Sequence, residues 1–253
     1  MSENPVKLHY VEFGKGFPLV LVHGFPLNHT IWDPMVPLLQ ERARVILPDL
    51  RGHGRSPAPD GVYSMSALAA DLAALLDELG VERAVLAGHS MGGYASLAFA
   101  QTYPQRLAGL ALVASLPAAD SPERREGRFA TIAEVTRDGV NGLAEKMATQ
   151  LTQQVNLVEP LRHLIQSATV AGVIGSLKGM AERPDLSEFL AGLKLPVVLV
   201  AGDQDTIVPF ERAQALASTL CQGRLVKAPG AGHLPMMETP DIVADALLQL
   251  LPE

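Results

Sequence analysis

A serine enclosed by glycines is the feature of this sequence best suited to chemistry. Ser90 stands in AVLAGHSMGGYASLAFA, with Gly88 two residues before it and Gly92 two residues after it. The short run of apolar residues before the serine predicts a buried strand, and the helical spacing of the apolar residues after it predicts a helix. A serine on such a tight turn has a strained backbone, and side chains two positions away would collide, so glycine is required there. The turn would expose the Ser90 hydroxyl at the start of a helix, where developing negative charge is stabilised.

A serine hydroxyl is a poor nucleophile unless a base takes its proton and an acid orients that base. Of the seven histidines, only His163 and His233 follow Ser90. His163 falls in the helix-like stretch EPLRHLIQS and is expected at the surface. His233 falls in the loop APGAGHLPMMETP after a late strand, from where it can reach a serine at the carboxyl edge of a parallel sheet. His233 is therefore the predicted base.

The acid that orients the base should follow another late strand. The stretch AGDQDTIVP supplies Asp203 and Asp205 directly after the strand expected at residues 195–202. Both side chains suit a turn at the end of a strand. We favour Asp205, keep Asp203 as the alternative, and place Asp120, which follows the strand expected at residues 107–114, third.

The carbonyl oxygen of an attacked ester gains charge and needs preorganised N–H donors. One donor is expected from Met91, directly after the nucleophile, and the other from the loop HGFP at His23–Pro26. Pro26 has no N–H, so Phe25 is the predicted second donor. Three further polar residues of these loops are expected to hold turns: His23, Arg51 and His53.

The elements that must position these residues alternate between strand and helix. Strands are expected at 6–13, 18–22, 43–47, 84–87, 107–114, 195–202 and 223–227, and helices at 32–41, 64–79, 91–103, 210–221 and 236–251. Between them, residues 117–193 show only helix-like stretches, at 121–137, 139–152, 158–167 and 168–183. This order predicts an α/β fold with a mostly parallel central sheet flanked by helices. Residues 1–116 and 194–253 form its core, and residues 117–193 form an inserted helical lid.

Composition limits the class of protein. The 253 residues are 48% apolar and 19% charged, which suits one α/β domain with a large core. The net charge of −7 is unlike that of a nucleic-acid-binding protein, and the single Cys221 excludes an intrachain disulfide. The first residues lack the pattern of a signal peptide, and the longest apolar stretch, 107–119, is too short to span a membrane. We expect a cytoplasmic protein with no nucleic-acid or membrane partner; the sequence leaves its oligomeric state open.

Five motifs together carry a resemblance to a known family. HGFP (23–26), DLRGHGRS (49–56), GHSMGG (88–93), GDQDTIVP (202–209) and GHLPMMETP (232–240) occur in the order and spacing of the α/β-hydrolase superfamily. Within it, the chain resembles small bacterial carboxylesterases and perhydrolases. The resemblance covers nearly the whole chain outside the expected lid. It implies the α/β-hydrolase fold, a triad of Ser90, Asp205 and His233, and neither a metal nor an organic cofactor.

The resemblance also narrows the reaction. Members that cleave carbon–halogen bonds or open epoxides carry aspartate where this chain has Ser90, so we exclude those reactions. The HGFP loop and Met91 differ from the HGGPG loop and tryptophan of prolyl aminopeptidases. We therefore expect a carboxylesterase that forms an acyl-enzyme from small to medium uncharged acyl groups. A lactonase, a C–C bond hydrolase of a ring-cleavage pathway, a cofactor-free perhydrolase and a non-enzymatic small-molecule receptor are the alternatives.

The substrate pocket is predicted to be apolar, since none of the five motifs contains a basic cluster that would select an acidic substrate. Its candidate lining residues, besides Phe25 and Met91, are Leu27, Leu116, Met147, Met180, Ile207, Val208 and Leu234.

Overall fold

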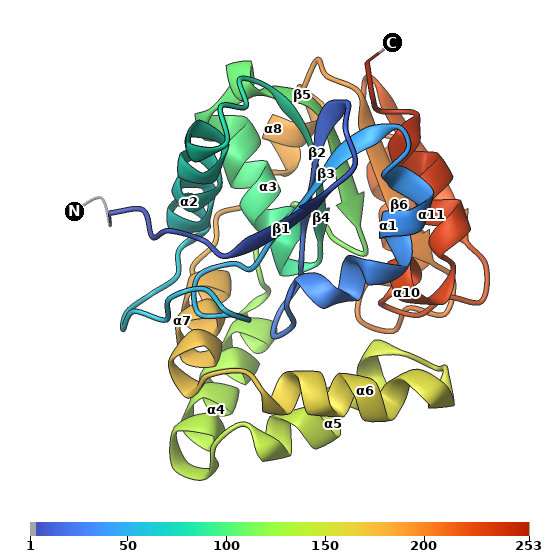
Figure 1. The fold of residues 1–253 in the computed structure, drawn as a ribbon. Helices are drawn as coiled ribbons and strands as arrows, with labels where there is room; N and C mark the ends of the chain where they lie inside the picture. Colours follow the sequence, from blue (N-terminus) through green and yellow to red (C-terminus); the bar gives the residue numbers. More distant parts are fainter. Residues whose placement is uncertain (1–3, 253) are drawn as a thin grey trace.

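A twisted sheet of seven strands forms the centre of the molecule (Figure 1). The computed structural model describes residues 4–252; residues 1–3 and 253, which the predicted core limits include, lie outside the described part. The strands follow the order β1-β3-β2-β4-β5-β6-β7, and only β1 runs antiparallel to its neighbour. Their bounds are β1 Tyr10–Phe13, β2 Phe17–Val22, β3 Ala43–Pro48, β4 Ala84–His89, β5 Leu107–Val113, β6 Val197–Gly202 and β7 Gly223–Ala228. The α/β-hydrolase fold predicted from the sequence is confirmed.

Side chains alternate between the two faces of the sheet and so divide the core into two clusters. In β2, Val20 and Val22 join the cluster beneath helices α2 (Met65–Glu78) and α3 (Met91–Thr102), while Leu19 and Leu21 join the opposite cluster. Strand β4 repeats the pattern, because Leu86 falls in the first cluster and Val85 in the second. Strands buried on both faces explain why the sequence shows continuous apolar runs at β2 and β4 rather than polar alternation.

Helices cover both faces of the sheet (Figure 1). One face carries α2 Met65–Glu78 and α3 Met91–Thr102; the other carries the 3₁₀-helix η1 His29–Met35, α1 Val36–Leu39, α10 Pro235–Glu238 and α11 Pro240–Leu248. Helix α9 Phe210–Ala217 joins β6 to β7, and the short 3₁₀-helix η2 Pro104–Arg106 precedes β5. Among residues 4–252, no helix combines the length and the apolar character needed to cross a membrane.

Five helices separate β5 from β6 and make up a helical insertion (residues 114–196). They are α4 Pro122–Asp138, α5 Asn141–Leu151, α6 Val155–Gln166, α7 Val170–Ala181 and α8 Ser187–Ala191. Helices α4, α5 and α6 lie together beyond one end of the sheet, and α7 packs against α4 and lies below α2 in this view (Figure 1). In α4, Val135 alone is buried, so most of its surface faces solvent.

Helix α7 lies in backbone contact with the core. A Cβ atom at Gly172 would stand 1.9 Å from the Gly52 carbonyl oxygen, and one at Gly179 would stand 1.7 Å from the Tyr63 carbonyl oxygen. The Tyr63 N–H donates to the carbonyl of Gly175 at 2.9 Å, on the same side of the helix. Glycine is required along this side of α7 because no side chain fits between the helix and the segment before α2.

Several predicted elements differ from the observed ones where proline interrupts them. The expected final helix at 236–251 is two helices, because Pro240 cannot donate to the preceding turn and begins α11 instead. The expected helix at 32–41 begins as 3₁₀-helix around Pro34 and becomes α-helical only at Val36–Leu39. The strand predicted from Val6 starts at Tyr10, because the Val6 N–H is bound by the Asp71 carboxylate at 2.8 Å. Helix α8 was not predicted.

The contact of α7 gives a stability prediction. We expect Gly179→Ala to lower the free energy of unfolding by about 1–3 kcal/mol, because α7 must shift to admit the methyl group. Gly127→Ala in α4 is the matched control, since a Cβ there meets no atom within 4 Å. The control should raise the free energy of unfolding by about 0.5–1 kcal/mol through helix propensity. Urea unfolding monitored by circular dichroism measures both; equal effects of the two variants would contradict the close contact.

Candidate active site

Ser90 occupies the turn between β4 and α3 in a backbone conformation that non-glycine residues rarely adopt. Its φ is 48° and its ψ is −112°. The Ser90 N–H donates to the Val113 carbonyl of the neighbouring strand at 3.0 Å. Its own carbonyl accepts from the Ser115 hydroxyl at 2.8 Å and from the Gly93 N–H at 2.9 Å. The strain is thus held on both sides by hydrogen bonds to β5, to the residues after it and to the first turn of α3.

The glycines on either side of Ser90 are required by close approaches of the backbone. A Cβ atom at Gly88 would stand 2.3 Å from the Gly92 carbonyl oxygen. A Cβ atom at Gly92 would stand 2.3 Å from the Val22 carbonyl oxygen, at the end of β2. The steric requirement expected from the spacing G-x-S-x-G is therefore present in the structure.

Asp205 and His233 meet at the carboxyl edge of the sheet. The His233 Nδ1–H donates to Asp205 Oδ2 at 2.8 Å, and both side chains are buried. The other oxygen of Asp205 accepts the N–H groups of Ile207 at 2.8 Å and Val208 at 2.9 Å. A carboxylate held in this way fixes the histidine tautomer that leaves Nε2 unprotonated. The alternative acid, Asp203, binds Lys227 at 3.0 Å instead.

The loop around His233 is held from several sides. The His89 Nε2–H donates to the His233 carbonyl at 2.8 Å, and the His233 N–H donates to the Leu151 carbonyl of α5 at 3.0 Å. The His89 and His233 rings meet edge to face with centroids 4.9 Å apart. Because His89 directly precedes Ser90, this contact brings His233 close to the serine. Among the described residues no hydrogen bond joins the Ser90 hydroxyl to the His233 ring; such bonds are often long before substrate binds.

Glu238 supports the same loop, a role that we did not predict. Its Oε2 accepts the N–H groups of Gly232 at 2.8 Å and Leu234 at 3.3 Å, the two residues that flank His233. Its Oε1 accepts the hydroxyl of Thr152, which follows α5, at 2.5 Å. The residue lies within the motif GHLPMMETP, but nothing in the pattern says that its carboxylate turns back to the loop.

The predicted oxyanion donors lie on two segments that touch. Met91 is the first residue of α3, where backbone N–H groups have no partner within the helix. Phe25 lies in the turn closed by the Leu27 N–H and the Gly24 carbonyl at 3.0 Å. A Cβ atom at Gly24 would stand 2.4 Å from His89 Nδ1, so this turn lies directly against the residue before the serine.

Two buried histidines hold the neighbouring loops, as expected. The His23 Nδ1–H donates to the Gly24 carbonyl at 2.9 Å, while Nε2 accepts the Leu50 N–H at 2.9 Å. The His53 Nδ1–H donates to the Arg51 carbonyl at 3.0 Å. Burial lowers the pKa of His23 to about 3 and that of His53 to about 4. Burial, together with the neighbouring His233, also lowers the pKa of His89 well below its usual value. These rings are therefore neutral at pH 7.

One group of side chains has donor atoms close enough to suggest a metal site. The donor atoms of His9, His29 and Asp49 lie within 4.8 Å of one another. The Asp49 carboxylate, however, already accepts the His29 ring at 2.7 Å and the N–H groups of His29 and Arg55, each at 2.9 Å. Burial alone would raise the pKa of Asp49, but these hydrogen bonds outweigh it and lower the pKa to about 2. The hydrogen bonds of this group hold the loop after β2 to the loop after β3, which explains why the three side chains lie together.

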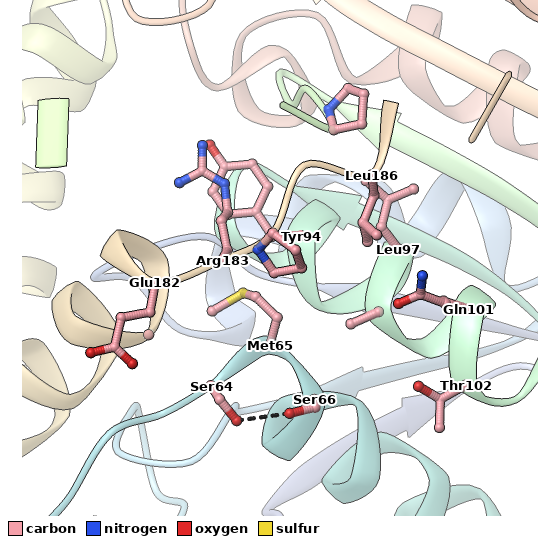
Figure 2. Close-up of a pocket in the computed structure, with 14 residues that line it drawn as sticks. Ser64, Met65, Ser66, Tyr94, Leu97, Gln101, Thr102, Glu182, Arg183 and Leu186 are labelled. Atoms are coloured by element: carbon pink, nitrogen blue, oxygen red, sulfur yellow. Dashed lines mark hydrogen bonds between the residues drawn. The ribbon is translucent and has the colours of Figure 1, made fainter. Parts of the chain in front are cut away.

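Leu116 and Val208, two of the predicted pocket residues, line a cavity of about 330 Å³ together with Tyr94 and Arg183. Figure 2 shows a second cavity of about 230 Å³ that shares Tyr94 and Arg183 as a wall and has Gln101, Ser64 and Glu182 among its polar residues. The remaining candidates lie deeper or beside the core. Leu27, Met180 and Leu234 are at most 3% exposed, and Met147 and Ile207 are partly buried against the core clusters.

The parallel sheet, the strained serine after β4 and the Asp–His pair after β6 and β7 define a class, the hydrolases of the α/β-hydrolase fold. The model of that family matches residues 18–240, and the chain belongs to it.

Solved structures and curated proteins with similar sequences agree with this assignment. A thermophilic esterase from Thermogutta terrifontis, determined with malate bound, is 42% identical with a TM-score of 0.92, covering 96% of this chain and 92% of that one. The enol-lactonase from Burkholderia xenovorans LB400 is 25% identical with a TM-score of 0.89, covering 97% and 96%. The dihydrolipoyllysine-residue acetyltransferase component of the acetoin cleaving system of Pseudomonas putida is 34% identical; the match covers 96% of this chain and 66% of that protein.

The buried histidines predict an acid-sensitive fold. In the unfolded chain His53 takes up a proton near its ordinary pKa of about 6.5, but in the folded protein only near pH 4. Unfolding therefore binds a proton between these values, and stability must fall as the pH falls from about 6.5 to 4. For His53 alone we expect a loss of about 3 kcal/mol across this window.

The variant His53→Asn, which keeps an N–H donor for the Arg51 carbonyl, should show a shallower dependence of unfolding free energy on pH in that window. His163→Asn is the control, because the side chain of His163 is 70% exposed and should leave the slope unchanged. Urea unfolding at a series of pH values from 4 to 8 measures the slopes. A His53→Asn slope equal to that of the wild type would show that this ring does not cause the acid sensitivity.

Proposed function

We propose that this hydrolase is a carboxylesterase with Ser90 as nucleophile, His233 as base and Asp205 as the acid that orients the base. The observation that carries the proposal is the buried 2.8 Å hydrogen bond between His233 Nδ1 and Asp205 Oδ2, in a loop bound to the residue before Ser90. An aspartate that fixes Nδ1–H leaves Nε2 free to take the serine proton. The esterase of T. terrifontis, at 42% identity, supports esters as the substrate class.

The reaction proceeds in two acyl transfers. The Ser90 oxygen bonds to the ester carbonyl carbon while His233 Nε2 takes the hydroxyl proton, and the backbone N–H groups of Phe25 and Met91 stabilise the oxyanion. The tetrahedral intermediate collapses, the C–O bond to the alcohol breaks, and His233 returns the proton to the leaving oxygen. Water then attacks the acyl-enzyme with His233 again as base, and the carboxylic acid leaves as Ser90 recovers its proton. The helical insertion acts as a lid over the acyl group.

Hydrolysis of 4-nitrophenyl esters from acetate to dodecanoate tests the proposal. We expect multiple turnovers by the wild-type protein and their loss in Ser90→Ala, with an optimum at short to medium chain length. A lactone is a cyclic ester and would use the same residues. Enol-lactones are therefore added to the series, and the substrate type with the higher kcat/KM separates an esterase from a lactonase. Activity that survives Ser90→Ala, or one equivalent of product and no more, would rule the proposed mechanism out.

The assignment of the acid has its own matched pair of variants. Asp205→Asn keeps the shape of the side chain but stabilises the wrong tautomer of His233, so kcat should fall about 10³- to 10⁴-fold. Asp203→Asn keeps an oxygen that can accept the Gly230 N–H and loses only the surface ion pair with Lys227, so it should keep kcat within about twofold. If Asp203→Asn were the more damaging variant, the acid would be assigned to the wrong residue.

A further inference from the structure

The cavity of about 330 Å³ that contains Leu116 and Val208 has two lining residues that hydrogen-bond to members of the proposed triad. The N–H of its lining residue Tyr94 donates to the Ser90 carbonyl at 3.3 Å. The N–H of Val208 donates to the Asp205 carboxylate at 2.9 Å. Tyr94 stands four residues after Ser90 on α3, a rise of about 6 Å along the helix. A substrate bound to Ser90 therefore needs only a short spacer to reach this cavity.

The same cavity is basic, although the whole chain carries a net charge of −7. Its charged lining residues are three arginines and two aspartates: Arg124, Arg183, Arg212, Asp120 and Asp185. Arg128 adds a fourth guanidinium through its ion pair with Asp120. Four guanidinium groups thus meet two carboxylates, which leaves an excess of two positive charges with both acids ionised.

Two of these arginines have donors to spare. Asp120 is bound closely by Arg128 and, at 2.8 Å, by Arg183, while Arg124 forms a longer ion pair with it through Nε at 3.4 Å, which leaves the terminal nitrogens of Arg124 outside that pair. Arg212 is exposed and forms no ion pair with the residues at 4–252. Arg183 is fixed by Asp120 and stacks over the Tyr94 ring at 4.1 Å, so it forms a wall, and its buried Nε has no partner among the described residues (Figure 2).

Arg124 and Arg212 come from two separate elements. Arg124 lies in the first turn of α4, whose N-cap Ser121 also lines the cavity, and Arg212 lies in the first turn of α9. Backbone N–H groups at a helix N-terminus favour an anion in the same way as the guanidinium groups do. Forked guanidinium donors match the two oxygens of a carboxylate.

We propose that this cavity is an anion subsite of the active site and that the enzyme prefers esters whose acyl chain ends in a carboxylate. The proposal rests on the esterase function of Ser90 and names its substrate class, since the acyl chain would leave Ser90 along Tyr94 and place its terminal carboxylate between Arg124 and Arg212. Sequence motifs alone indicated uncharged acyl groups, because these arginines lie outside the five motifs and converge only in the fold.

Two esters of equal acyl length test the subsite. The wild-type protein should hydrolyse the mono-4-nitrophenyl ester of adipate with a higher kcat/KM than 4-nitrophenyl hexanoate. The ratio of the two values should fall about fivefold in Arg212→Gln, as for loss of one solvent-screened charge interaction, and similarly in Arg124→Gln. It should also fall at 0.5 M NaCl, where the Debye length shrinks to about 4 Å.

Arg42→Gln is the control for the change in net charge. Arg42 is exposed and directly precedes β3, at the edge of the sheet opposite to the active site. The control should keep the wild-type ratio and the activity on hexanoate. A wild-type ratio in Arg212→Gln and Arg124→Gln, or an equal fall in Arg42→Gln, would overturn the subsite while leaving the esterase function intact.

Binding separates the subsite from the chemistry. In the Ser90→Ala protein, isothermal titration should show tighter binding of adipate than of hexanoate, and the additional change Arg212→Gln should abolish the difference. If the wild-type protein hydrolysed neither ester, the proposed function would fail and this titration alone would decide the subsite. Equal binding of adipate and hexanoate by the Ser90→Ala protein would refute it.

Discussion

The structure depends on a steric constraint at one point, where β4 turns directly into α3 and its backbone comes almost into contact with β2. Gly92 has room for no side chain against the Val22 carbonyl, and this approach brings α3 beside the loop that follows β2. The same contact thereby sets the position of the Ser90 hydroxyl and brings together the segments that carry the N–H groups of Phe25 and Met91. One close approach thus places the proposed nucleophile and the N–H groups proposed to stabilise the oxyanion, and the strained φ of Ser90 is the cost of that arrangement.

The proposed base, His233, is held by a different kind of interaction. His233 receives its tautomer from Asp205, while its backbone is fixed by His89 from the core and by Leu151 from the insertion. Glu238 connects the same loop to Thr152. The position of the base therefore depends on the helical insertion as well as on the sheet. Neutral buried rings such as His89 provide these hydrogen bonds without adding charge beside the site. The charge in the pocket therefore comes from the side chains that line it.

The sequence was sufficient for the fold and for choosing Ser90, Asp205 and His233 as candidates, because both depend on local patterns, and the structure brings Asp205 and His233 together. Residues close together in the sequence are enough to identify the apolar runs of strand length, the glycines around Ser90 and the loops after the late strands. The support that Glu238 gives to the His233 loop and the proposed anion-binding role of Arg212 could not be predicted from the sequence, because each depends on segments that lie far apart in the chain. A carboxylate that turns back on its own loop, or an arginine that meets another from a distant helix, has no periodicity to detect. Proline positions explain the helix ends that differ from the prediction. The sequence pattern places Pro240 inside one helix at 236–251, whereas Pro240 begins α11.

The glycine side of α7 holds this helix to the core much more tightly than α4 is held. Contacts of Gly172 and Gly179 with the backbone of the core make α7 a fixed member of the main layer, whereas α4 exposes nearly all of its surface. The segment from α4 to α6 is instead joined to the core mainly through α5 and α6, whose Leu151 and Ile165 are buried in the core cluster beneath η1 and α11. Substitutions in α4, at Arg124 for example, can therefore change a wall of the cavity without repacking the sheet, whereas changes in α5 would also disturb the His233 loop.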